Sequence, residues 1–184
     1  MIATLVTRME TSLRHAGYAT CLDPAIPGVT ARMYALLRRP RGAVFSKFHN
    51  HYLFLDWGKD LFSQLERLLQ AREFFSELVN KSYKTPRAWR LTLPNLALIV
   101  VSERGYDPET IQVALNQYFV PAMSGECGQI MLVDLSSGTL TCHHESNYKQ
   151  TGSIPLEDAA REIGKLFLYQ YPGGRVVRTS QEEF

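Results

Sequence analysis

Two short histidine-rich segments contain the residues best suited to chemistry. They are Phe48-His49-Asn50-His51 and Cys142-His143-His144-Glu145. Side chains two residues apart in a strand point to the same face, so His49 with His51, and Cys142 with His144, could each supply two ligands. Imidazole and thiolate groups are common Zn²⁺ ligands. The pattern therefore predicts, as one alternative, a zinc site, and a zinc ion with an open position would support a metal-dependent hydrolase or nuclease.

The same four residues also fit a simpler interpretation, in which strand-end histidines are solvated or hydrogen-bonded to the backbone and no cofactor is needed. The three cysteines favour that view, because Cys21, Cys127 and Cys142 are an odd number and form no Cys-x-x-Cys pair. This spacing is unlike a disulfide framework or a thiolate zinc cluster. We expect reduced thiols, with Cys127 on a loop and without a neighbouring base.

Basic residues are concentrated in two stretches without aspartate or glutamate, Pro24 to Leu55 and Leu78 to Ser102. The candidates for a binding surface in these stretches are Arg38, Arg39, Arg41, Lys47, Lys81, Lys84, Arg87 and Arg90. Residues 103–135 instead contain five acidic residues and a single arginine. We therefore expect a basic face opposite an acidic face, although the net charge is only +2.

A basic surface of this kind has three interpretations. It could bind a protein partner with an acidic surface, including a second copy of the chain. It could bind nucleic acid, with Tyr34, Phe45 and Phe48 stacking on bases beside the phosphate-binding cations. It could also be a solvated turn whose aromatic neighbours point inward.

Established catalytic motifs do not occur in the chain. It contains no phosphate-binding Gly-rich loop, no dinucleotide fingerprint, no His-Glu-x-x-His and no Gly-x-Ser-x-Gly. Asp56 and Glu103 follow predicted strands, where catalytic acids often lie. Capping is the commoner role of such acids, and nothing in the sequence names a reaction.

Hydrophobic periodicity and turn residues predict the elements that must position these side chains. The expected helices are residues 2–16, 59–80, a helix capped by Asp107 before Pro108, and a helix that begins near Pro155. The expected strands are residues 18–22, 29–37, 43–48, 51–56, 96–101, 129–135 and 139–145. Residues 38–42 are expected to form the turn of a hairpin.

The order of these elements predicts an α+β fold, a single domain over residues 1–174 with a mixed or antiparallel sheet built from hairpins and packed by about four helices. Residues 175–184 read as a polar C-terminal tail. The longest apolar run, residues 96–101, is too short to span a bilayer, and the N-terminal segment does not resemble a signal peptide, so we expect a cytoplasmic protein.

The functional expectation is a non-enzymatic accessory or interaction protein that acts through its basic face, within a larger assembly or as a homodimer. The alternatives are the metal-dependent hydrolase or nuclease and the nucleic-acid-binding module.

Overall fold

The computed structural model describes residues 1–26, 29–41, 47–58, 64–84, 90, 92–117, 126–144 and 154–179; of residues 38–41, 47, 64, 65 and 154 it describes the backbone only. Its helices are α1 (Ile2–His15), α2 (Gln64–Ser82), α3 (Pro108–Leu115) and α6 (Ile154–Gln170). Its strands are β1 (Ala19–Leu22), β2 (Thr30–Arg41), β3 (Lys47–Asp56), β4 (Thr92–Ser102), β5 (Cys127–Asp134), β6 (Thr139–His143) and β7 (Arg175–Thr179).

The described strands form one mixed sheet in the order β1-β2-β3-β4-β5-β6-β7. The pairs β1–β2, β2–β3 and β5–β6 are antiparallel, while β3–β4, β4–β5 and β6–β7 are parallel. The hydrophobic run of β4 lies at the centre of the sheet and is buried on both faces from Pro94 to Ser102. A strand covered on both sides is expected to be apolar at every position, as this one largely is.

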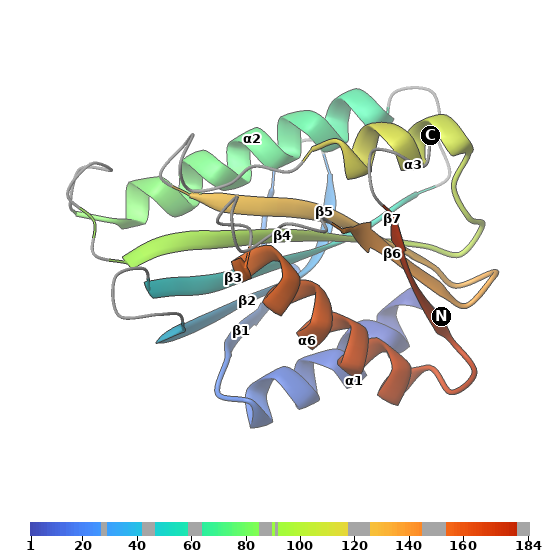
Figure 1. Ribbon diagram of the computed structural model, residues 1–184, viewed down its shortest axis with the longest axis horizontal. Helices are drawn as coiled ribbons and strands as arrows, with labels where there is room; N and C mark the ends of the chain where they lie inside the picture. Colours follow the sequence, from blue (N-terminus) through green and yellow to red (C-terminus); the bar gives the residue numbers. More distant parts are fainter. Residues whose placement is uncertain are drawn as a thin grey trace.

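Helices cover both faces of the sheet, so the molecule has three layers (Figure 1). Helices α1 and α6 pack on one face around a core that includes Met9, Leu13, Tyr52 and Phe167. Helices α2 and α3 cover the other face, and α2 directs Leu68 and Phe75 into a second core (with Ala71 and Val79 on the same side). Each helix is buried along one stripe, the pattern of an amphipathic helix on a sheet.

The α+β fold with a mixed sheet and four helices is therefore confirmed for the described residues. The predicted cap of α3 is also confirmed, because Asp107 Oδ1 accepts a hydrogen bond from Thr110 N at 2.8 Å and Pro108 follows. No described helix has the length and apolar character needed to cross a membrane.

Three local predictions are wrong, and one of them, the loop expected at Cys127, is described with the functional site below. Residues 38–41 do not turn but continue β2 through an irregularity between Leu37 and Arg41, which accommodates Pro40 in the strand. Residues 175–179 are not a tail but form β7, paired in parallel with β6. The alternation of β7 is weak in the sequence, and pairing with β6 decides its structure. Residues 180–184 lie outside the described residues.

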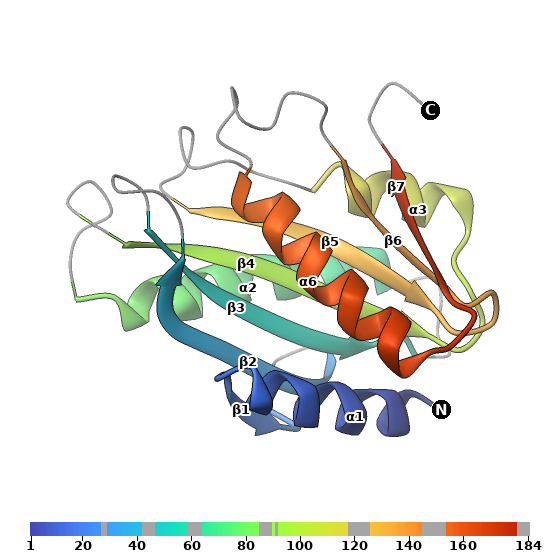
Figure 2. The same ribbon diagram turned by 60° about the horizontal axis from the view of Figure 1, so that its bottom comes forward.

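Strand direction defines two opposite edges of the sheet. Strands β3, β4 and β5 begin at the first, which we call the amino edge; β2, β6 and β7 finish there and α6 begins there (Figure 2). The same three strands finish at the other, which we call the carboxyl edge. The chain therefore returns to the amino edge several times, from segments that are distant in sequence.

Candidate functional site at the amino edge of the sheet

The predicted basic residues lie at the amino edge. Arg38, Arg39 and Arg41 are among the last residues of β2, and Lys47 is the first residue of β3. Lys81 and Lys84 stand at the end of α2, and Arg90 precedes β4. Arg87 is outside the described residues. The fold thus brings two separate basic stretches of sequence to one edge.

Five of the described acidic residues lie at the carboxyl edge. Asp56 and Asp134 end β3 and β5, Glu103 follows β4, and Asp107 and Glu109 begin α3. Arg32 lies there too, but it is bound to Asp56, with Nη2 at 2.6 Å from Oδ2. These five acidic residues and the predicted basic residues therefore lie at opposite edges of the sheet rather than on its two faces. The amino edge also contains acidic residues, namely Glu126 before β5 and Glu157 and Asp158 at the start of α6.

Beneath the basic residues, on the α2 face, lies a cluster of histidines and tyrosines. The Tyr34 hydroxyl is 2.7 Å from Nδ1 of His51, and the Tyr83 hydroxyl is 3.4 Å from its Nε2. Tyr83 is also 3.2 Å from Nδ1 of His49. A neutral imidazole has one donor and one acceptor nitrogen, so the two hydroxyls meet both needs of His51. Burial, and then the charge of His49, lower the pKa of His51 to about 3, which keeps it neutral.

Arg90 is part of this cluster rather than a projecting cation. Its guanidinium lies 4.6 Å from the centre of the Tyr83 ring and donates to the side-chain oxygen of Asn80. Asn80 in turn donates to Glu126, which also accepts from Ser76 Oγ at 2.6 Å. These contacts fix the end of α2 against the segments that lead into β4 and β5. Lys81 and Lys84 remain exposed.

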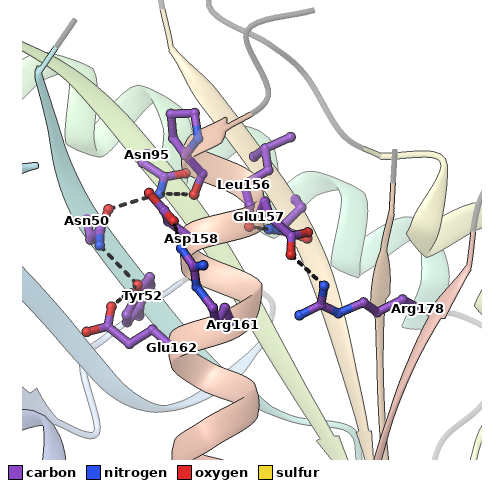
Figure 3. Close-up of polar contacts among 11 residues, drawn as sticks. Asn50, Tyr52, Asn95, Leu156, Glu157, Asp158, Arg161, Glu162 and Arg178 are labelled. Atoms are coloured by element: carbon purple, nitrogen blue, oxygen red, sulfur yellow. Dashed lines mark hydrogen bonds and ion pairs between the residues drawn. The ribbon is translucent and has the colours of Figure 1, made fainter. Parts of the chain in front are cut away.

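On the α6 face, a buried polar network joins β3 and β4 to α6 (Figure 3). Asn95 donates to Asn50 Oδ1 at 2.9 Å and to the Pro155 carbonyl at 3.0 Å. Asn50 donates to the hydroxyls of Tyr18 and Tyr52, and both tyrosines donate to Glu162 Oε2, at 2.6 and 2.7 Å. The network ties the first turns of α6 to the amino edge.

The two buried cysteines, Cys127 and Cys142, are part of the packed interior. Cys127 is not on a loop: it begins β5 and donates to Asn95 Oδ1 at 3.2 Å. Burial raises the pKa of the Cys127 thiol well above its usual value and that of Cys142 to about 11. Thiols of this kind stay protonated and unreactive at neutral pH. Cys21, by contrast, is exposed on β1.

The four predicted zinc ligands are not brought together. The side chains of His49 and His51 face α2, whereas Cys142 belongs to the core on the α1 and α6 side. Two strands, β4 and β5, separate β3 from β6. His144 lies on the Cys142 side, with Nδ1 3.9 Å from Glu157, and Glu157 also pairs with Arg178. Within the described ranges, no three histidine, cysteine or acidic residues are grouped to hold a metal.

The aromatic residues expected to stack on bases are packed against the hydrophobic cores where they are described. Phe48 is buried, and the Tyr34 ring packs edge-on against Phe75, with centroids 6.0 Å apart. Phe45 lies outside the described residues. Of the three rings proposed for base stacking, the two that are described are therefore used by the fold.

Sequence analysis missed the buried network of Asn50, Asn95 and Glu162. A signal was available, because each of these polar residues interrupts an apolar segment: the two asparagines lie within buried strands, and Glu162 is next to the apolar stripe of α6. Buried polar groups are almost always hydrogen-bonded. Their partners, however, lie up to 144 residues away in sequence and could not be paired in advance.

Comparison with family models, with curated proteins and with solved structures found no match to this chain. The class of protein is therefore the one that its fold and site define: an α+β domain whose mixed sheet has basic residues at the amino edge and acidic residues at the carboxyl edge.

Proposed function

We propose that this chain is a non-enzymatic interaction protein that binds an acidic surface of a protein partner through its amino edge. The partner is a component of a larger assembly or a second copy of the chain. The observation that carries the proposal is the placement of Arg38, Arg39, Arg41 and Lys47 on adjacent strand ends, beside Lys81 and Lys84. Clustered cations steer and orient an acidic partner.

One observation favours a protein partner over nucleic acid. Phe48 is buried and the Tyr34 ring is half-buried against Phe75, so the fold already uses the described rings that were expected to stack on bases. The exposed carboxylates of Asp107 and Glu109 at the carboxyl edge are a suitable surface for the amino edge of a second copy, in a head-to-tail arrangement.

The two polar clusters support the proposal by making the amino edge a fixed surface. The network from Glu162 to Asn95 holds the beginning of α6, and the Arg90–Asn80–Glu126 contacts hold the end of α2. A preformed surface loses less conformational freedom on binding. The hydrolase alternative has less support, because its ligands come from both faces of the sheet.

Affinity purification from cells that naturally produce the protein tests this function. We would compare the wild type with Arg38→Glu/Arg41→Glu/Lys84→Glu and with a control, Arg8→Glu/Arg14→Glu/Arg161→Glu, that reverses the same number of charges on α1 and α6. We expect a stoichiometric protein partner with the wild type and the control, released by salt and lost in the amino-edge variant. Light scattering of the purified chain at low and high salt identifies self-association.

Retention of the same partner by the amino-edge variant would refute the proposal. So would binding of a labelled oligonucleotide whose affinity falls by roughly 0.9 log unit per log unit of salt for each phosphate contact, which would favour the nucleic-acid alternative.

A further inference from the structure

A pocket of about 380 Å³ lies at the carboxyl edge, opposite the proposed partner surface. Its walls come from the start of α1, the residues that follow β3 and the residues that follow β4. Strands β3 and β4 are parallel neighbours. The space outside the carboxyl ends of parallel strands is where open α/β sheets commonly bind ligands.

Most of the charged groups that line this pocket have partners of opposite charge. Asp56 binds Arg32, and Glu103 Oε1 accepts from the Met1 amino group at 2.7 Å and from Ile2 N at 3.0 Å. Arg104 also lines the pocket, and its charge, after the hydrogen bonds from Met1 and Ile2, helps to lower the pKa of Glu103. Arg32 lies 3.9 Å from Asp23 in addition to its bond with Asp56. In the described part of the chain, the Arg104 guanidinium makes no ion pair or hydrogen bond of its own, so it is the cation of the lining that is open to a ligand.

The beginning of α1 already holds one carboxylate. Hydrogen bonds from the Met1 amino group and from Ile2 N lower the pKa of Glu103. This is the favourable position for an anion, since the first N–H groups of a helix have no partners within the helix. The N-cap residue Met1 supplies no side-chain acceptor for that first turn, so further donors remain beside the Glu103 carboxylate.

Trp57 provides an apolar wall with a polar group of its own. The side chain is 9% exposed, lines the pocket and lies 5.7 Å from the ring of Tyr106. Its indole Nε1 is buried and has no hydrogen-bond partner in the described structure. A buried donor without an acceptor costs about 1–3 kcal/mol, and the signal of this N–H group should respond to a ligand that packs against the ring.

We propose that this pocket binds a small organic carboxylate, a monoanion with an apolar body. The carboxylate pairs with the Arg104 guanidinium, and the apolar body packs against Trp57. A single negative charge matches the one guanidinium of the described lining that has no ion pair, whereas a doubly charged phosphate would leave one of its charges unmatched beside Asp56 and Glu103. A neutral molecule of the same shape lacks the pairing with Arg104.

Benzoate is a suitable probe, and benzamide is its uncharged counterpart. Binding is followed by the indole N–H signal of Trp57 in ¹⁵N–¹H correlation spectra, assigned with the variant Trp89→Phe. We expect a saturable shift with millimolar benzoate and none with benzamide. Arg104→Gln should weaken benzoate binding at least about tenfold, the loss expected when a charge-assisted hydrogen bond is removed. Arg161→Gln, an exposed arginine of α6, should leave binding unchanged.

A Trp57 signal that does not shift with benzoate, or that shifts equally in Arg104→Gln, would overturn the assignment. Equal shifts with benzamide would also do so, because the pocket would then not select for charge. Repeating the titration in Arg38→Glu/Arg41→Glu/Lys84→Glu separates these outcomes from the proposed partner surface, because a head-to-tail pairing would bring the amino edge of a second copy to this pocket.

Discussion

Three polar residues near the amino edge are almost completely buried. Asn50, His51 and Asn95 are each at most 3% exposed. Each has hydrogen-bond partners on at least one neighbouring element, so the desolvation cost of the polar atoms is offset. These hydrogen bonds persist only while the partner residues keep their positions. Substitution of any of the three residues should therefore affect the structure of the amino edge.

The stability of the protein should depend on pH through His51. The pKa of this imidazole is about 3 in the folded protein, because it is buried, and near 6.5 when unfolded. Above pH 6.5 both states are neutral and His51 adds no pH dependence. As pH falls below 6.5 the unfolded state takes up the proton, and the folded state loses about 1.4 kcal/mol of stability per pH unit.

The measurement is urea unfolding at pH 7 and pH 5 for the wild type, His51→Gln and His15→Gln. Between these two values we expect the wild type to lose about 2 kcal/mol more than His51→Gln. His15 is exposed on α1, so His15→Gln should follow the wild type. Equal losses in all three proteins would mean that His51 is protonated in the folded state.

At the scale of elements, β7 shows how pairing can create a strand from a weak local pattern. Residues 175–179 are only partly buried. Their backbone pairs with all five residues of β6, and Val176 packs against the core beneath α6, where it lies near Gly164. Without β7, the ladder groups of β6 that face it would be unpaired.

Truncation before Arg175 should therefore destabilise the protein. Two half-buried valines and a strand ladder are lost, and burial of one aliphatic side chain contributes about 1.5–3 kcal/mol. We expect the free energy of unfolding to fall by about 2–3 kcal/mol. Truncation after Thr179 is the control, because it keeps every described strand. If both truncations have equal stability by urea unfolding, β7 does not contribute to the folded domain.

At the scale of the whole molecule, charge is separated along the strand direction. The net charge of +2 hides this separation, because opposite charges lie at opposite edges. An ion-exchange resin binds the patch of a protein with the highest density of opposite charge. Retention therefore depends on that patch more than on the net charge of the protein.

Cation-exchange chromatography tests the separation directly. We would compare two variants that each lose three positive charges. The first is Arg38→Ser/Arg39→Ser/Arg41→Ser, and the second is Arg8→Ser/Arg14→Ser/Arg161→Ser. We expect the first variant to elute at clearly lower salt than the second, because only the first removes charge from the amino edge. Identical elution would show that the arginines of β2 do not form a common surface with the lysines.

Local patterns in the sequence predicted most of the elements and their order, with β7 as the exception. The long apolar run of β4, the Asp107-Pro108 start of α3 and the stripe of α2 each follow from local periodicity and capping, which act over a few residues. The gathering of basic residues was also predictable in outline, because the acid-free stretches are visible as composition.

Which of these residues are in contact depends on the three-dimensional fold. His49 and Cys142 each belong to a pair of possible ligands two residues apart. The order of the strands and the direction of the side chains nevertheless place the two pairs on opposite sides of the sheet. Asn95 meets Asn50 and α6, and Arg104 meets Trp57 around a pocket, through parallel pairing of strands that are distant in sequence. Such contacts depend on strand order and register, which are set by the packing of the whole chain and not by any local pattern.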